Sequence, residues 1–137
     1  MAKIRTFDHC GFVVEDIPRS HQFYHTLLGA KPLHIQNLNT QRLYQGGFPV
    51  MSFVEMGGHR FELCLAQEPL PKVEGAGTMP RIGFSLSDEM MDEMMKQLDA
   101  NQIPHEGPID YPDPVPFKRT IRVWDPDGNT LEFCVRR

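Results

Sequence analysis

The sequence predicts an α+β fold built from two copies of one strand–helix–strand–strand–strand module. Two pairs of matching segments carry this prediction. FELCL at residues 61–65 matches LEFCV at residues 131–135, and their glutamates are 132 − 62 = 70 residues apart. FDHCGFVVED, from residue 7, matches MPRIGFSLSD, from residue 79, and their glycines are 83 − 11 = 72 residues apart. Two matches in the same order indicate two structural modules, each of which begins with one matched strand and ends with the other.

The first module is expected over residues 1–66. Residues 3–15 are rich in Val, Ile and Phe, which is typical of a strand. Asp16 then offers a helix N-cap, Pro18 suits the first helical turn, and Gly29 is placed to end the helix. Strand-like runs follow at residues 31–39, 43–44, 50–55 and 60–66, with turns predicted at Asn39 and Gly46-Gly47.

A linker is expected over residues 67–78, which contain two prolines and two glycines, and the second module over residues 79–137. Ser87 or Asp88 is placed to cap its helix, and Asn101 to end it. The apolar residues of this helix are predicted to pack on the sheet: Met90, Met91, Met94, Met95 and Leu98. A strand near residues 103–106, a proline-rich loop over 108–117 and a hairpin of residues 119–124 and 130–135 complete the module.

Composition narrows the function classes. The 137 residues carry a net charge of −4 with no basic stripe, which argues against a nucleic-acid partner. No apolar run approaches the ~20 residues that span a bilayer, so no membrane partner is expected. The three cysteines lack close pairing and the first residues lack the apolar core of a signal peptide, which together predict a cytoplasmic protein.

The two repeated glutamates are predicted to line a concave space. Because alternate residues of a strand share a face, Glu62 points away from Phe61 and Leu63, and the same alternation holds around Glu132. The bulky residues are expected to pack under the helix of each module. The face that carries each glutamate also carries a small cysteine, Cys64 or Cys134, for which we expect a packing role.

Four polar groups are predicted to point into this space, from the first and last strands of both modules: His9, Glu62, Arg81 and Glu132. A buried carboxylate needs a metal, a cation or a proton, because desolvating the charge alone is costly. The identity of the partner therefore decides the chemistry of the site.

These residues resemble the vicinal oxygen chelate superfamily, which includes glyoxalase I, fosfomycin-resistance proteins, bleomycin-resistance proteins and extradiol dioxygenases. The resemblance rests on His9 followed by DIPRSHQFYHTLLGAK, on FELCLA and on RVWDPDGNTLEFCV. It implies two βαβββ modules whose curved, mixed and mostly antiparallel sheets form a cleft around a divalent metal. It also implies a homodimer and a small-molecule substrate that the metal holds through two neighbouring oxygens.

The resemblance places the superfamily's four metal ligands on His9, Glu62, Arg81 and Glu132. Arg81 stands where the superfamily usually has histidine, and a guanidinium has no lone pair to give a metal. Two interpretations stay open. His9, Glu62 and Glu132 hold Zn, Ni, Mn or Fe(II), or Arg81 pairs with the carboxylates in the metal's place.

The resemblance implies an enzyme of the glyoxalase or dioxygenase type, a metal-dependent lyase, isomerase or dioxygenase that acts on a small oxygenated metabolite. Glu62 or Glu132 would be the general base, and Arg81 would stabilise developing negative charge. The alternative is a metal-free binding protein, like the drug-sequestering bleomycin-resistance members.

The proline-rich loop is predicted to cover the cleft as a lid, since loops at the open end of a scaffold commonly carry specificity. Its substrate-binding residues would be Tyr111, Phe117 and Arg119, with Lys118 beside them. A stiff surface connection is the alternative.

Overall fold

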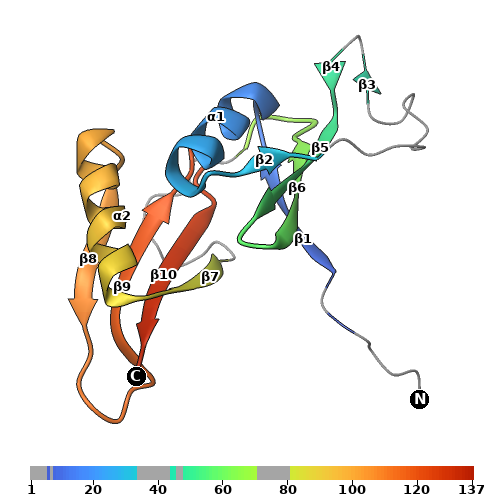
Figure 1. Cartoon of the computed structure of the whole chain (residues 1–137). Coiled ribbons are helices and arrows are strands. Elements are labelled where there is room, and N and C mark those ends of the chain that lie inside the picture. Colours follow the sequence, from blue (N-terminus) through green and yellow to red (C-terminus); the bar gives the residue numbers. More distant parts are fainter. Residues whose placement is uncertain (1–5, 7, 34–43, 46–47, 71–80) are drawn as a thin grey trace. The chain divides into compact units, whose positions relative to one another are not determined.

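The computed structural model describes residues 6, 8–33, 44–45, 48–70 and 81–137. The chain divides into two compact units, Met1–Pro71 and Lys72–Arg137, and each contains one helix and one four-stranded sheet (Figure 1). The predicted α+β fold of two βαβββ modules is therefore confirmed. None of the helices in the described part of the chain is long and apolar enough to cross a membrane.

The first unit is a mixed sheet with a helix on one face. Its sheet has the strand order β1-β6-β5-β2, in which β1 and β6 run parallel and the other pairs antiparallel. The elements are β1 (His9–Val14), α1 (Ile17–Leu28), β2 (Lys31–Pro32), β5 (Met51–Met56) and β6 (His59–Leu65). A separate two-stranded sheet pairs β3 (Tyr44–Gln45) with β4 (Phe48–Pro49).

Helix α1 begins and ends where the sequence predicts. Asp16 is the N-cap, and its Oδ1 accepts a hydrogen bond from the Arg19 backbone N–H at 2.9 Å. Gly29 has the left-handed conformation of a C-cap, with φ of 63°. The helix and the sheet enclose a core of buried side chains: Phe12, Val14, Ile17, Tyr24, Leu27, Val54, Phe61 and Leu63.

The second unit repeats the arrangement with the strand order β7-β10-β9-β8. Strands β7 and β10 run parallel, and the other pairs are antiparallel. The elements are β7 (Arg81–Leu86), α2 (Asp88–Ala100), β8 (His105–Asp110), β9 (Phe117–Trp124) and β10 (Thr130–Arg136). Buried side chains of the sheet and helix form its core: Met91, Met94, Leu98, Ile121, Val123, Leu131, Phe133 and Val135.

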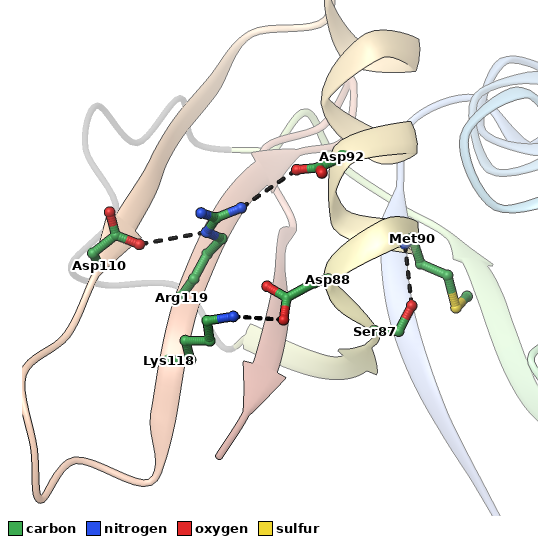
Figure 2. A network of polar contacts seen from close by, with 7 residues as sticks. All are labelled: Ser87, Asp88, Met90, Asp92, Asp110, Lys118 and Arg119. Atoms are coloured by element: carbon green, nitrogen blue, oxygen red, sulfur yellow. Dashed lines mark hydrogen bonds and ion pairs between the residues drawn. The ribbon is translucent and has the colours of Figure 1, made fainter.

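The residues predicted to cap α2 do so, whereas one residue predicted to be buried in the core is exposed. Ser87 Oγ accepts a hydrogen bond from the Met90 backbone N–H at 3.2 Å (Figure 2), and Asn101 is the C-cap. Met90 was predicted to face the sheet with Met91 and Met94, but its side chain is 53% exposed. It lies in the first turn, beside the capping residue and at the margin of the buried face.

The proline-rich loop is shorter than predicted because β8 continues to Asp110 and β9 begins at Phe117. Strand β8 is the edge of its sheet, and its register with β9 shifts between Glu106 and Ile109. An edge strand with a bulge tolerates a proline, because the missing N–H interrupts no inner ladder. The backbone of β8 comes close to that of β9 at Gly107, which has a φ of 114°. Only glycine fits there, since a Cβ would lie 2.8 Å from the Thr120 carbonyl oxygen.

Several predicted segments lie outside the described residues. They are residues 3–5 and 7 of the first predicted strand, residues 34–39 of the second, residue 43 of the third, the turns at Asn39 and Gly46-Gly47, and residues 71–78 of the predicted linker. The division between the two units falls within that linker.

Candidate functional site

Each sheet has one face against its helix and a second face, here called the open face, on the other side. Strand alternation and register assign the side chains to these faces. The open face of the first unit carries His9, Gly11 and Val13 on β1, Arg60, Glu62 and Cys64 on β6, and Glu55, Phe53 and Met51 on β5. That of the second unit carries Arg81, Gly83 and Ser85 on β7, Thr130, Glu132 and Cys134 on β10, Trp124, Arg122 and Thr120 on β9, and Glu106 on β8.

In the first unit, the structure places Glu62 beside Gly11 on the neighbouring strand. A Cβ added to Gly11 would lie 3.3 Å from Glu62 Oε2, so the carboxylate lies against this glycine. His9 lies on the same face, and its ring meets the edge of Phe53 at a centroid distance of 5.8 Å. The predicted pair of His9 and Glu62 therefore shares one face of two adjacent strands.

The tautomer of His9 follows from its partner. Nδ1 lies 2.8 Å from Asp8 Oδ2, and this hydrogen bond holds the pKa of Asp8 below its ordinary value. An ionised carboxylate only accepts, so Nδ1 carries a hydrogen, and in the neutral imidazole the lone pair is on Nε2. A histidine bonded in this way is suited to accept a proton or to bind a metal.

Cys64 and Cys134 are not activated thiols. Burial, and after it the Glu62 carboxylate, raises the pKa of Cys64 to about 11. Burial and the Glu132 carboxylate raise the pKa of Cys134. Both thiols stay protonated at neutral pH, which favours packing over nucleophilic chemistry.

In the second unit, four charged side chains form a row across the whole open face, here called the charged row. Glu106 on β8, Arg122 on β9, Glu132 on β10 and Arg81 on β7 follow one another in the order of the strands. Arg122 Nη1 donates to Glu106 Oε2 at 3.1 Å, and Arg122 Nε donates to Glu132 Oε1 at 3.3 Å. Arg81 Nη1 lies 3.5 Å from the same Glu132 oxygen.

The sequence pattern also indicates Arg122, which was not among the predicted site residues, through the register of the last hairpin. Counting back from the DPDG turn pairs Trp124 with Thr130 and therefore Arg122 with Glu132. Burial works to lower the pKa of Arg122, but the carboxylates of Glu132 and Glu106 outweigh it and the pKa lies above its ordinary value. Arg122 thus stays charged between two carboxylates.

The other predicted substrate residues lie in different places. Figure 2 shows Arg119 between Asp110 and Asp92, at 3.4 Å from each, and Lys118 Nζ at 2.6 Å from Asp88. Arg119 pairs in register with the buried Val135, so it lies on the helix side of the sheet. The contacts to Asp88 and Asp92 join β9 to α2, and the contact to Asp110 joins it to β8. The substrate role expected for Arg119 stays a prediction.

Tyr111 and Phe117 flank the short loop. The Thr120 hydroxyl, on the open face, donates to the Tyr111 hydroxyl at 3.5 Å. The Arg136 guanidinium lies over the Phe117 ring, 5.4 Å from its centroid. Tyr111 is therefore the loop residue that the structure brings to the open face.

The charged row decides how well a divalent metal fits the second unit. Glu132 Oε1 already has two guanidinium groups within 3.5 Å. A metal there would face two fixed cations, and arginine cannot become a ligand by losing a proton. The residues of the second unit do not fit a metal centre, whereas His9 of the first unit would suit one.

The predicted metal set combines His9 and Glu62 of the first unit with Glu132 of the second, and it stays a prediction. Within the described residues, no three His, Cys, Asp or Glu side chains gather in a way that could hold a metal ion. The helical pair His21 and His25 is engaged elsewhere, because His21 Nε2 bonds Ser52 Oγ at 2.9 Å and His25 Nδ1 bonds the Ala30 carbonyl at 3.1 Å.

A family model described as the Glyoxalase/Bleomycin resistance protein/Dioxygenase superfamily matches residues 6–133. The chain belongs to this superfamily. The match confirms the resemblance that the repeated segments carry, and it extends over both modules.

Several solved structures share the fold of this chain. The fosfomycin resistance protein FosX from Listeria monocytogenes matches with a TM-score of 0.74 at 16% identity, over 98% of this chain and 94% of that chain. A mutant of it, complexed with Mn(II) and 1S,2S-dihydroxypropylphosphonic acid, matches with a TM-score of 0.73 at 15% identity, over 98% and 95%. An integron cassette protein of V. Cholerae matches with a TM-score of 0.65 at 23% identity, over 98% of each chain. At these identities the likeness shows the fold.

Proposed function

We propose that this superfamily member binds a small, oxygen-rich anion through Arg81 on the open face of its second sheet, and that it does so without a divalent metal. The observation that carries the proposal is the position of Glu132 Oε1 between the guanidinium groups of Arg122 and Arg81, at 3.3 Å and 3.5 Å. This carboxylate already has its cations, and a metal is not needed to balance it.

The two arginines differ in how many of their N–H donors are already bonded to protein groups. Arg122 is bonded to two glutamates, and its side chain is 21% exposed. Arg81 has one ion pair among the described residues, at 3.5 Å, and its side chain is 43% exposed. A guanidinium has five N–H donors, so most of those of Arg81 are available to the two oxygens of an anionic group. Arg81 is therefore the ligand-binding group, and Arg122 holds the carboxylate beside it.

A phosphonate is the first anion to test. The structure of a FosX mutant contains 1S,2S-dihydroxypropylphosphonic acid, a phosphonate with two adjacent hydroxyl groups. Phosphonate oxygens match the fork of a guanidinium in spacing and charge. Propylphosphonate, which lacks the hydroxyl groups, is the matched probe for the anionic group alone.

An enzyme with Glu62 as general base is the second candidate function. No lysine or arginine in the described part of the chain forms an ion pair with Glu62, which lies half-buried beside Gly11 and accepts a hydrogen bond from the Cys64 thiol. A carboxylate without a cation partner can take up a proton, as a general base must. Arg81 would then stabilise the developing negative charge. The metal-dependent version, with His9, Glu62 and Glu132 around Zn, Ni, Mn or Fe(II), is the alternative to both.

Titration calorimetry with the two phosphonates tests the proposal. Wild type is compared with Arg81→Ala, and Arg19→Ala removes an exposed arginine of α1 as the matched control. Each titration is run with EDTA and with added Mn(II). We expect EDTA to leave the affinity of the wild type unchanged, and Arg81→Ala to weaken both probes by at least about tenfold. Binding that requires Mn(II), or equal binding by wild type and Arg81→Ala, contradicts the proposal.

We also propose that the protein is a homodimer, as the superfamily resemblance implies. The chain mass is 15.7 kDa. Light scattering at micromolar concentration should give about twice that mass. A species of the chain mass alone would rule the dimer out.

A further inference from the structure

Thr130, the first residue of β10, has a hydroxyl group for which the described part of the chain offers no hydrogen-bond partner. The residue is 1% exposed, and its Oγ1 is the buried side-chain oxygen or nitrogen that lacks a hydrogen bond among the described residues. Buried polar groups in proteins are nearly always hydrogen-bonded, and an exception needs an explanation. Thr130 stands two residues before Glu132, so its side chain lies on the open face of the second sheet.

A charged and an aromatic side chain stand next to the Thr130 hydroxyl on the neighbouring strands. Arg81 is its register partner on β7, and Trp124 is its partner on β9. A cation, a hydroxyl group and an indole ring thus occupy one level of three adjacent strands. Such a combination can bind the charged group, a polar oxygen and the carbon skeleton of one small molecule.

The turn before Thr130 fixes its position. Asp125 Oδ1 accepts hydrogen bonds from the backbone N–H groups of Asp127 and Asn129, at 2.9 Å and 2.8 Å. Asp125 Oδ2 accepts a third from Asn129 Nδ2 at 2.8 Å. The backbone just before Thr130 is therefore held on both sides, and the hydroxyl is presented from a rigid element, as a specificity group should be.

We infer that the Thr130 hydroxyl is the second contact of the ligand that Arg81 binds, and that it bonds a ligand hydroxyl next to the anionic group. This inference rests on the proposed function and names its ligand class more closely, as anions with an adjacent hydroxyl group. Because Oγ1 is covered, binding requires a side chain beside it to move. Arg81 has that freedom, since its long side chain is half-exposed and its ion pair with Glu132 is long, at 3.5 Å.

Two substitutions and the two phosphonate probes test the inference. Thr130→Val replaces the hydroxyl with a methyl group of similar size, and Thr130→Ser keeps the hydroxyl. We expect Thr130→Val to weaken 1,2-dihydroxypropylphosphonate by about tenfold and to leave propylphosphonate unchanged, because the second probe has no hydroxyl to lose its bond. Thr130→Ser should bind both probes like the wild type.

Thermal unfolding without ligand is the companion measurement. A hydroxyl that makes no hydrogen bond costs nothing to remove, so Thr130→Val should melt at or above the wild-type temperature. A clearly lower melting temperature would mean that Oγ1 has a structural partner, and this overturns the inference.

The outcomes separate this inference from the proposed function. If Arg81→Ala weakens both probes while Thr130→Val weakens neither, the Thr130 contact is wrong and the arginine site stands. If Thr130→Val weakens both probes equally, the contact is not to the adjacent hydroxyl and the inference fails. If neither probe binds the wild type, the proposed function and the inference fail together.

Discussion

Glu62 and Glu132 occupy equivalent positions in the two modules, yet their surroundings differ in charge. Each is paired with a glycine on the parallel neighbour, Gly11 or Gly83. On the antiparallel side, Glu62 faces Phe53, whereas Glu132 faces Arg122. Glu62 lies against its glycine, where a Cβ would be 3.3 Å from Oε2, but a Cβ on Gly83 would meet only the Glu132 carbonyl oxygen, at 3.9 Å.

One cross-strand residue accounts for this difference. Arg122 draws the Glu132 carboxylate to its own side by a charged hydrogen bond of 3.3 Å, and an apolar phenylalanine cannot do the same to Glu62. The two modules therefore keep the position of the glutamate and change its charge environment. The second module holds a balanced row of ion pairs, and in the first the glutamate faces an apolar ring.

The first strands extend the comparison. His9 and Arg81 each stand two residues before the paired glycine, so they are equivalent as well. In the neutral imidazole of His9 the lone pair is on Nε2, because Nδ1 donates to Asp8, whereas Arg81 is permanently charged. The repeat thus places an imidazole in the first module where the second has a guanidinium.

Removing Arg122 should have the largest effect on stability. Arg122→Ala leaves Glu106 and Glu132 without their main partner, and the partly buried Glu132 carboxylate keeps only the longer contact to Arg81. We expect a loss of about 2 kcal/mol in the free energy of unfolding, measured in urea. Arg60→Ala, an exposed arginine on the open face of the first unit, is the control and should change it by less than about 0.5 kcal/mol. Equal effects of the two substitutions would show that Arg122 does not stabilise the second module through Glu106 and Glu132.

High pH should destabilise the first unit through Cys64. The pKa of this thiol is raised from 9.0 to about 11 in the folded protein, so the unfolded chain loses the proton first. Stability therefore falls as pH rises from 9 to 11. The thiol is only partly buried, so we discount the shift to a loss of about 1 kcal/mol. Cys64→Ala should show a smaller fall over this range in parallel urea titrations, and an identical fall would refute the assignment.

The same thiol reports on the Glu62 carboxylate. Glu62→Gln removes the negative charge that stands second to burial among the causes of the raised pKa of Cys64. We expect the pKa of Cys64 to move down toward its ordinary value, measured by the pH dependence of its alkylation in a Cys10→Ser, Cys134→Ser background. An unchanged titration would place Glu62 away from Cys64.

Alanine at the two glycines should give the smallest effects, and they should differ between the modules. Gly83→Ala meets no atom closer than 3.9 Å and should stabilise the strand by about 0.5 kcal/mol. Gly11→Ala brings Cβ to 3.3 Å from Glu62 Oε2, so the carboxylate must move and the gain should vanish. Urea titrations of both variants compare the sites, and an equal gain at Gly11 would show that Glu62 does not lie against it.

Much of this arrangement could be read from local chemistry. The caps at Asp16, Gly29 and Ser87 follow from residue types whose side chains or backbone freedom suit helix ends. The faces of Glu62 and Glu132 follow from alternation alone. Arg122 and the helix-side position of Arg119 also follow from alternation, once the hairpin register is counted from the DPDG turn.

The features that the sequence does not predict depend on contacts between strands. The end of β8 at Asp110 requires a bulge that keeps Pro108 on an edge strand, and the residue types alone favour a loop. The sequence does not show that the Thr130 hydroxyl lacks a partner among the described residues, because threonine is common in strands and its hydrogen bonds are seen only in the structure.

We propose that Arg81 takes the place of a metal, and the metal content of the purified protein tests this. Wild type and Arg81→His are purified without chelators, and their bound Zn, Ni, Mn and Fe are measured by elemental analysis. Arg81→His removes a cation and supplies an imidazole donor at the position where the superfamily usually has one, so it is the positive control. We expect no stoichiometric divalent metal in the wild type and a clear gain in Arg81→His. Stoichiometric metal in the wild type would contradict it.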